Sequence, residues 1–275
     1  MNDFFLRDDL KRALAPTNQF DDILALHGEI FRELNGRRTF RFQRAGQSYF
    51  AKLHFGIGWG EVLKNLAQLQ LPIVSARNEW LAIRHLEQHN IGTMTLAGYG
   101  ERGSNPASVE SFVLTDELTD TVSLEELVLE WSSQPPSPLF RRAIIHELAR
   151  MARVMHQSGM NHRDFYLCHF LLANNQREST PVRLHLIDLH RAQLRSHTPR
   201  RWQLKDLAGL YFSAMNAGFS RRNYLRFVRL YVGKSLRLLS DSEKTFWLHV
   251  ERKAIPLHHK LYRRAPDRLF FGTSA

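Results

Sequence analysis

The first 118 residues alternate short strand-like repeats with amphipathic helix patterns. Ile23, Leu26, Ile30 and Leu34 have helical spacing, but "EIFRELNGRRTFRF" is also a hairpin signal around Asn35-Gly36. A second turn, "RAGQ", and the strand "SYFAKLH" follow. We therefore predict a helix to about residue 27 and then a three-stranded meander over residues 29–54.

The next stretch combines one clear helix with two further strands. In "SARNEWLAIRHLEQHNIG", Trp80, Ile83 and Leu86 lie along one stripe, and Gly92 is expected to stop the helix near its end. "MTLAGYGERG" and "SFVLTDEL" are typical of strands joined by a turn-rich connection. Residues 1–118 are thus predicted to form a small antiparallel sheet with one prominent helix.

Beyond residue 118 the pattern becomes mainly helical. Ser123 and Glu126 form a capping-box pattern, and "SSQPPSP" is a linker-like break. The strongest helix signal runs from Arg141 to Ser158, with Gly159 at C′. Two short strands, "HFLLA" and "VRLHLIDL", flank the hairpin "NNQREST", and the chain is helical and basic from Lys205. Residues 119–275 are therefore predicted to form a second, mainly helical lobe.

Composition limits the class of protein. The chain has 275 residues, of which 43% are hydrophobic, so it can bury a substantial core. The single cysteine, Cys168, permits no intramolecular disulfide, which fits a reducing compartment. The N-terminal stretch lacks the apolar core of a secretory signal, and no apolar run approaches the roughly 20 residues of a membrane span. We expect a soluble, cytoplasmic protein.

The net charge of +11 is unevenly distributed along the chain. Residues 191–275 carry 18 Lys and Arg against 5 Asp and Glu, whereas residues 1–190 carry 20 against 22. Such an asymmetry favours a polyanionic partner, such as nucleic acid, an anionic membrane or a phosphorylated or carboxylated substrate. The alternative is a solvated basic face that aids solubility.

Four charged residues fall in an order that indicates phosphoryl transfer. Lys52 ends the third predicted strand, and Glu79 on the next helix can hold it against nucleotide phosphates. Asp164, in the triplet "HRD", can accept the proton of an attacking hydroxyl, and Asp188 at a strand end can bind Mg²⁺. Lys52 and Glu79 alone fit a structural role equally well, whereas Asp164 favours function, because "HRD" follows a helix and precedes a two-strand hairpin that ends in Asp. The order of all four predicts the two-lobed α+β protein-kinase fold.

Two features depart from a protein kinase. No GxGxxG lies between the first two strands, so the phosphate-covering turn is expected to be short and basic, around Asn35-Gly36 and the following arginines. His169 stands five residues after Asp164, where protein kinases have a metal-binding asparagine. It could bind the metal, although Mg²⁺ prefers oxygen ligands, contact Asp164 or a phosphate oxygen, or brace the loop.

The segment after Asp188 is short and rich in arginine. It has no "APE" motif, and it carries Arg191, Arg195, Arg200 and Arg201. Guanidinium groups bind carboxylates and phosphates with two-point geometry, so an anionic glycolipid acceptor fits better than a peptide. Asp206, in "KDLAGLYFSA", is predicted to anchor the catalytic loop from a buried helix, or else to be a plain carboxylate near a helix N-terminus.

Several longer strings resemble one family. They are "YFAKLHFGIGWGEVLKNL", "ARNEWLAIRHL", "GERGSNP", "NHRDFYLCHFLL", "LIDLHRAQLR" and "RRWQLKDLAGLYFSA". Over residues 28–227 the chain resembles the bacterial lipopolysaccharide core heptose(I) kinases. This resemblance implies transfer of the γ-phosphate of ATP to the 4-hydroxyl of the first inner-core heptose, at the cytoplasmic face of the inner membrane.

The resemblance also implies roles for individual residues. Asp164 is the implied catalytic base, Asp188 the Mg²⁺ ligand, and Lys52 with Glu79 the pair that positions the phosphates. Glu117, in the hinge-like "SFVLTDEL", and His169 are counted with the nucleotide-binding residues, and His169 also as a candidate metal ligand. Arg163, Arg191 and Arg195 are the candidate acceptor contacts.

The basic C-terminal third suggests further partners. Arginines surround an aromatic face over residues 223–232, which could contact an anionic leaflet or simply belong to the core. An acidic protein such as acyl carrier protein would suit the same surface. Alternative functions are another inner-core sugar kinase, for the second heptose or Kdo, a catalytically dead pseudokinase scaffold, and a basic nucleic-acid-binding protein. No zinc-finger, RNP or helix-turn-helix pattern supports the last, so no nucleic-acid partner is expected.

Overall fold

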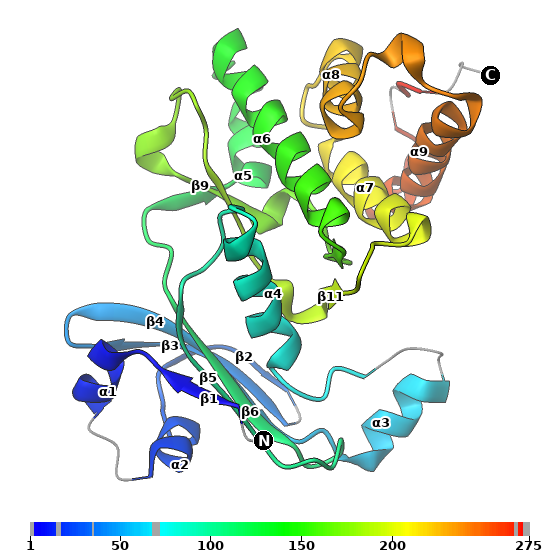
Figure 1. Cartoon of the computed structure of the whole chain (residues 1–275). Helices are drawn as coiled ribbons and strands as arrows, with labels where there is room; N and C mark the ends of the chain where they lie inside the picture. Colours follow the sequence, from blue (N-terminus) through cyan, green and yellow to red (C-terminus); the bar gives the residue numbers. More distant parts are fainter. Residues whose placement is uncertain (1–2, 15–17, 35, 68–71, 267–268, 272–275) are drawn as a thin grey trace. The chain divides into compact units, whose positions relative to one another are not determined.

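The computed structural model describes residues 3–14, 18–34, 36–67, 72–266 and 269–271. They fall into two compact units. The sheet unit comprises Met1–His85, Met94–Leu118 and Leu189–Arg191, and the helical unit comprises Leu86–Thr93, Thr119–Asp188 and Ala192–Ala275. An antiparallel sheet forms the centre of the first unit, and helices make up most of the second (Figure 1). The mixed fold class is as predicted.

The sheet unit contains a six-stranded antiparallel sheet in the order β1-β5-β6-β4-β3-β2. The predicted meander and the two later strands are confirmed, and a short edge strand is added at the N-terminus. The strands are β1 (Phe4–Leu6), β2 (Glu29–Leu34), β3 (Arg37–Arg44), β4 (Gln47–Phe55), β5 (Leu96–Arg102) and β6 (Glu110–Asp116).

The predicted Asn35-Gly36 turn joins β2 to β3. Leu34 pairs with Arg37 across the two strands, as a two-residue hairpin loop requires, and Gly36 has a φ of 73°. Asn35 itself lies outside the described residues. The helix predicted to reach about residue 27 ends earlier: α2 spans Gln19–Leu24, after α1 (Asp8–Leu14).

Alternation along β4 separates the core from the candidate site. Ala51 and Leu53 are fully buried in an apolar cluster with residues of β3, β6, α1 and α2. Because successive strand side chains point to opposite faces, Lys52 projects from the other face of the sheet. The side of the sheet that packs the core therefore differs from the side that presents the lysine.

The helix predicted around Trp80 is α4 (Arg77–Gln88), which follows α3 (Gly58–Ala67). The prediction that Gly92 stops this helix is wrong. The chain leaves the helix at Asn90, which has a φ of 54°. Gly92 is needed for a different reason: a Cβ there would come within 2.3 Å of the Leu184 carbonyl oxygen.

The helical unit begins with a short sheet, β7-β9-β10, and is completed by five helices in the described part of the chain. Within it α6 packs against α8, and α7 against α9 (Figure 1). The elements are β7 (Thr121–Ser123), α5 (Leu124–Glu130), α6 (Pro138–Gln157), β8 (Met160–Asn161), β9 (Phe170–Ala173), β10 (Leu184–Leu186), β11 (Gln193–Leu194), α7 (Arg200–Ala214), α8 (Arg221–Val232) and α9 (Asp241–Tyr262).

Helix starts follow the capping chemistry. The predicted capping box of Ser123 and Glu126 opens α5. The strongest predicted helix begins one turn earlier than Arg141, because Ser137 accepts a hydrogen bond from the Phe140 N–H and Pro138 is tolerated at N1. Gly159 ends it with a φ of 91°, as predicted.

The C-terminal third is helical as predicted, with α7 starting five residues before Lys205. On α8, Tyr224 and Val228 are buried in the unit's core, while Arg221, Arg222 and Arg229 are exposed. Tyr224 and Val228 are therefore core, the other members of this face (Phe227, Tyr231 and Val232) are half-buried, and the exposed arginines remain available to a partner. Asp267 and Arg268 of the basic tail lie outside the described residues. No helix in the described part of the chain is long and apolar enough to cross a membrane.

Candidate active site

Lys52 and Glu79 are brought together within the sheet unit. The Lys52 Nζ donates a hydrogen bond of 2.6 Å to Glu79 Oε1. The Glu79 side chain is only 2% exposed, whereas that of Lys52 is 27% exposed. A carboxylate buried to this degree needs a charged partner, and the partly exposed lysine retains the freedom to contact a ligand. The predicted pairing is present, and its role in nucleotide binding stays a prediction.

Asp206 of α7 holds the loop that carries Asp164. Asp206 is fully buried and accepts hydrogen bonds from the N–H groups of His162, at 2.7 Å, and Arg163, at 2.8 Å. The predicted anchoring role of Asp206 is thereby confirmed, because its carboxylate holds two loop N–H groups. The loop is fixed by a buried group that cannot contact a substrate itself.

His162 joins the loop to the strand end before Asp188. Its Nδ1 accepts from the Asp164 N–H at 3.3 Å, so its Nε2 carries the proton and donates to the Ile187 carbonyl oxygen at 3.0 Å. Burial lowers the pKa of His162 and keeps the ring neutral. The two segments that bear the candidate aspartates are thus tied by one neutral imidazole.

His169 contacts both segments. Its Nδ1 lies 2.6 Å from the Asp164 carbonyl oxygen, so Nδ1 is the donor. Its Nε2 lies 3.6 Å from Asp188 Oδ2. In a neutral ring this Nε2 is an acceptor, and two facing acceptors repel unless a proton or a metal cation lies between them. The geometry shows the histidine bracing the loop through Nδ1, and its role as a metal ligand beside Asp188 stays a prediction.

Backbone strain marks the same segments. Arg163, directly before Asp164, has a φ of 78°, and Asp188 has a φ of 61°. Non-glycine residues rarely adopt this conformation, which costs about 1–3 kcal/mol and is concentrated at functional sites. Arg163 is held in this conformation by the hydrogen bond from its N–H to Asp206.

A metal would have few side-chain ligands at this site. Among the described residues, no group of three or more His, Cys, Asp and Glu side chains gathers in a way that could hold a metal ion. Asp188 supplies the hard oxygen ligand that Mg²⁺ prefers, and His169 supplies a borderline nitrogen. The pair fits a Mg²⁺ ion that keeps several waters or phosphate oxygens in its shell.

The remaining predicted residues lie in different settings. Glu117 accepts a hydrogen bond of 3.1 Å from Arg41 in the sheet unit. Arg191 belongs to the sheet unit, whereas Arg163 and Arg195 belong to the helical unit, each with its guanidinium carbon within 6 Å of the Trp202 ring centre. The structure thus groups Arg163 with Arg195. Sequence reasoning missed Trp202, although "RRWQLK" places an aromatic ring among cations.

The arginines of the turn that was predicted to cover the phosphates, Arg37 and Arg38, contact other residues of the sheet unit. A side-chain nitrogen of Arg37 donates to the Ile73 carbonyl oxygen, and burial lowers the arginine's pKa. Arg38 pairs with Glu33 at 3.0 Å. Both arginines therefore already have polar partners within the sheet unit.

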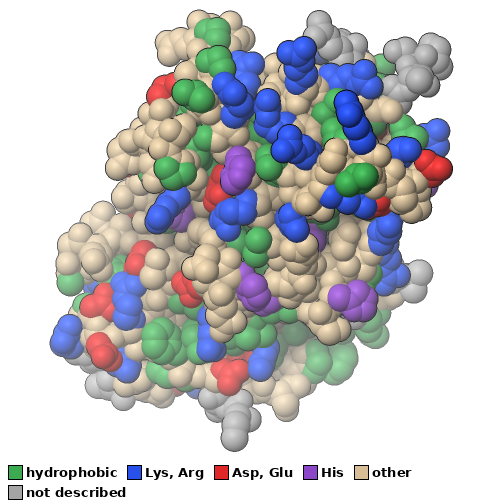
Figure 2. All heavy atoms as spheres, turned by 45° about the horizontal axis from the view of Figure 1, so that its top comes forward, with side chains coloured by type: hydrophobic (Ala, Val, Ile, Leu, Met, Phe, Trp, Pro, Cys, Tyr) green, Lys and Arg blue, Asp and Glu red, His purple; other side chains and the backbone are tan. Residues whose placement is uncertain are grey.

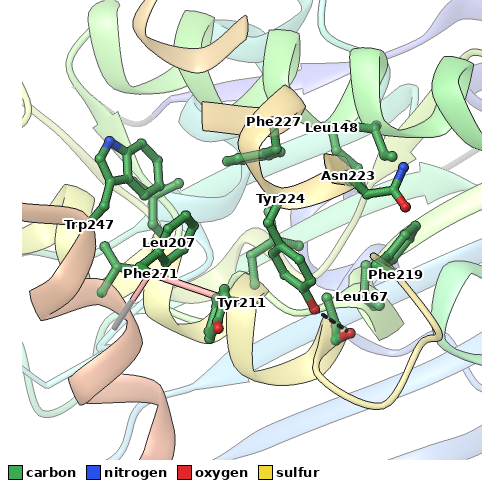
Figure 3. A pocket seen from close by; sticks show the side chains of 14 residues that line it. Leu148, Leu167, Leu207, Tyr211, Phe219, Asn223, Tyr224, Phe227, Trp247 and Phe271 are labelled. Atoms are coloured by element: carbon green, nitrogen blue, oxygen red, sulfur yellow. Dashed lines mark hydrogen bonds between the residues drawn. The ribbon is translucent and has the colours of Figure 1, made fainter. Parts of the chain in front are cut away.

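The core of the helical unit contains a small apolar cavity of about 50 Å³. Side chains of α7, α8 and α9 converge on it, among them Leu207, Tyr224 and Trp247, and Tyr224 donates to the Ala214 carbonyl oxygen (Figure 3). The buried Glu251 accepts hydrogen bonds from the N–H groups of Phe270 and Phe271. The Glu251 carboxylate thereby holds in place the segment that contains Phe271, one of the residues that line the cavity.

Comparisons with known proteins identify the family. A model of the lipopolysaccharide kinase (Kdo/WaaP) family matches residues 21–231. The chain is 48% identical over 260 residues to the lipopolysaccharide core heptose(I) kinase WaaP of Pseudomonas aeruginosa, covering 94% of this chain and 96% of that protein. It is 41% identical over 261 residues to WaaP of Escherichia coli K12, covering 94% and 98%.

A solved structure, "WaaP in complex with acyl carrier protein", superposes with a TM-score of 0.80 at 43% identity, covering 93% of this chain and 99% of that one. The likeness covers nearly the whole of both chains, and the predicted protein-kinase-like fold agrees with it. With the order Lys52, Glu79, Asp164 and Asp188 on the expected elements, the chain belongs to the lipopolysaccharide kinase (Kdo/WaaP) family.

Proposed function

We propose that this protein transfers the γ-phosphate of ATP to the 4-hydroxyl of the first heptose of the lipopolysaccharide inner core. The observation that carries the proposal is the 48% identity, over 94% of this chain, to a curated core heptose(I) kinase. The anchored loop around Asp164 supplies the chemistry that such a reaction needs.

Asp164 is the proposed general base. Its carboxylate takes the proton of the heptose hydroxyl as the oxygen forms a bond to the γ-phosphorus, while the bond to the leaving ADP breaks. Positioned proton transfer contributes about 10²–10⁴-fold to rate. The Asp206 anchor and the His162 bridge support this role, because they fix the backbone of the loop that carries Asp164.

Lys52 is proposed to neutralise phosphate charge, with Glu79 holding it in place. The short hydrogen bond and the burial of Glu79 support the pairing. Residues 1–118 are proposed to cover the nucleotide, with Glu117 in the hinge-like segment beside it. Asp188 and His169 would hold Mg²⁺, which when bound lowers the charge repulsion between phosphates and nucleophile.

The acceptor is proposed to be the inner core joined to lipid A, contacted by Arg163, Arg191 and Arg195. Its sugar acids and phosphates are anionic, and guanidinium groups recognise both. The exposed arginines of α8 would also favour an anionic leaflet, at about 1 kcal/mol per cation near the surface. We therefore place the reaction at the cytoplasmic face of the inner membrane.

An acyl carrier protein is the proposed protein partner. A groove of about 380 Å³ in the helical unit is lined by Arg142 of α6, Arg226 and Arg229 of α8, and His146. Lys and Arg side chains also gather over the helical unit on the face that Figure 2 shows. Such a surface suits an acidic protein. The complex named for the similar WaaP structure supports the same partner.

The function is tested with purified protein, ATP, Mg²⁺ and an inner core–lipid A acceptor that lacks phosphate on its heptoses. The expected product carries one new phosphate at the 4-position of the first heptose, located by mass spectrometry and phosphorus NMR. Phosphate on the second heptose or on Kdo would replace this acceptor with another inner-core sugar. No transfer to any sugar would reject the proposal.

The partner is tested separately by pull-down and light scattering with acyl carrier protein. Arg226→Glu together with Arg229→Glu is expected to weaken the complex at least tenfold, because two attractive contacts become repulsive. Arg252→Glu, an exposed position on α9, is the matched control. Equal weakening by both changes would show that general charge, and not this groove, attracts the partner.

A further inference from the structure

Four cations surround a single indole at the start of α7. The distances to the centre of the Trp202 ring are 5.3 to 5.7 Å, measured from the Nζ of a lysine and the guanidinium carbons of three arginines: Lys205, Arg163, Arg195 and Arg201. These residues come from the catalytic loop, from the end of β11 and from α7. We call them, with Trp202, the indole cluster.

The four cations of the indole cluster lie close together at the N-terminus of α7, where their like charges repel one another. Arg195 donates hydrogen bonds of 2.5 Å to Asn161 Oδ1 and Gln193 Oε1, both neutral oxygens. Burial and then the charge of Arg201 lower the pKa of Arg195. α7 also opens with Arg200 and Arg201 and no acidic residue, although a helix N-terminus favours negative charge. An anion bound at this place would relieve the repulsion.

Two buried hydrogen-bond donors lie in the same place. Asn161 is fully buried, and its Nδ2 has no hydrogen-bond partner among the described residues. The Trp202 Nε1 is likewise buried without a partner in the described part of the chain. Arg195 contacts both residues, one through a hydrogen bond and the other through the ring face. Buried donors almost always have an acceptor, and the described residues supply none for these two, which is consistent with a bound group that accepts hydrogen bonds.

The indole cluster is directly connected to the candidate catalytic base. Arg163 immediately precedes Asp164, and Lys205 immediately precedes Asp206, whose carboxylate holds the Arg163 N–H at 2.8 Å. The buried anchor therefore fixes the cluster and the loop together. A group bound by the cluster would be held at a fixed position relative to the Asp164 backbone.

We propose that the indole cluster is a subsite for an anionic substituent of the acceptor, a carboxylate or a phosphate, next to the hydroxyl that is phosphorylated. This inference rests on the proposed function, because it assumes that a sugar acceptor reaches Asp164. Planar guanidinium groups bind either anion at two points, and the indole face orients them. The subsite would select acceptors by the anionic group beside the target sugar.

The test compares three acceptors: the inner core–lipid A acceptor, the same molecule with its sugar carboxylates converted to methyl esters, and the same molecule without its lipid A phosphates. Arg201→Gln is the main variant because Arg201 is exposed and its replacement should not disturb the core. Arg195→Lys keeps the charge but loses two-point binding, and Lys205→Gln is a second charge-removing variant. Arg252→Gln on α9 is the matched control, and melting curves verify that each variant is folded.

For the unaltered protein, kcat/KM is expected to fall about tenfold when the recognised anion is removed, a typical effect of losing one charge-assisted contact. In Arg201→Gln the ratio of kcat/KM between the anionic and neutralised acceptors should approach one. If this ratio approaches one for the methyl-ester acceptor, the recognised group is a carboxylate. If it approaches one for the dephosphorylated acceptor, the recognised group is a lipid A phosphate.

Unchanged ratios in Arg201→Gln, Arg195→Lys and Lys205→Gln, with phosphate still transferred, would overturn the subsite alone. If the unaltered protein transferred phosphate to none of the three acceptors, the proposed function would fall, and the subsite with it. The Arg252→Gln control should keep the ratios of the unaltered protein, and the same collapse there would also reject the subsite.

Discussion

Two side-chain pairs, one in each unit, differ in how closely their two members are joined. In the sheet unit Lys52 and Glu79 form a hydrogen-bonded ion pair at 2.6 Å around a buried carboxylate. In the helical unit His169 and Asp188 stand 3.6 Å apart, beyond hydrogen-bond distance, and the histidine is oriented by its bond to the Asp164 carbonyl oxygen. The first pair is a closed ion pair, whereas the second has no hydrogen bond between its members and is the pair that we propose to hold Mg²⁺.

This difference separates a positioning role from a ligand-binding role. A closed ion pair fixes one side chain, so its loss should act through stability and nucleotide binding. The His169–Asp188 pair has no hydrogen bond between its members, so its loss should act more on turnover than on stability. Four experiments follow, from the largest expected effect to the smallest, and the Lys52 and His169 variants test this division directly.

Replacement of Asp164 by Asn should have the largest effect. The amide keeps the size of the side chain but cannot take the proton, so kcat should fall about 10²–10⁴-fold. ATP affinity should change little, as measured by calorimetry. If kcat fell less than tenfold, the base would have to be another residue.

Lys52→Met should leave the buried Glu79 carboxylate without its ion-pair partner. Breaking one side of a buried pair costs about 3–5 kcal/mol, measured as the free energy of unfolding in urea. The double variant Lys52→Met, Glu79→Met should recover much of that stability without recovering ATP affinity. Equal stability of the single and double variants would contradict a closed, buried pair.

His54, on β4 two residues after Lys52, should make stability depend on pH. Burial, followed by the charges of Arg37, Lys52 and His190, lowers its pKa from 6.5 to about 3. The unfolded chain binds the proton first, so stability contributed by the neutral ring is present above pH 6.5 and falls as the pH drops toward 3. Between pH 7 and 5 the loss should be about 2 kcal/mol.

The matched measurement is urea unfolding of the unaltered protein and His54→Gln at the two pH values. The variant lacks the titrating ring, so its stability should fall by about 2 kcal/mol less over the same range. The same pH dependence in both proteins would show that carboxylates elsewhere dominate the acid sensitivity.

His169→Asn should have the smallest effect of the four. An amide can replace both contacts, through its NH₂ group toward the Asp164 carbonyl and its oxygen toward a metal, so kcat should stay within about tenfold. His169→Leu should lower kcat further while changing the unfolding free energy by less than about 1 kcal/mol. A folding defect in His169→Leu, seen as a lower melting temperature, would show instead that the ring mainly braces the loop.

Local sequence patterns were sufficient to predict most helices and strands and the order of the charged residues on them. Strand patterning placed Lys52 on a strand, and helical spacing placed Glu79 on a helix, which is α4 and not the helix directly after β4. The meander and the short β9–β10 sheet follow from turn chemistry. The anchor role of Asp206 also followed from its position on a buried helix. Errors occurred where a single residue had two explanations: Gly92 suggested a helix stop, but the close Leu184 carbonyl is what excludes a side chain there.

The sequence by itself determined the family, the fold class and the residues that carry the candidate chemistry, because these are written in spacings of two to four residues and in long matching strings. Only the tertiary structure decided which cations meet. Arg163 and Lys205 are 42 positions apart, yet both lie over the Trp202 ring because the loop and α7 pack around the buried Asp206. It also oriented His169, whose Nδ1 contact leaves Nε2 toward Asp188. Such contacts depend on how distant segments pack, which no local pattern encodes.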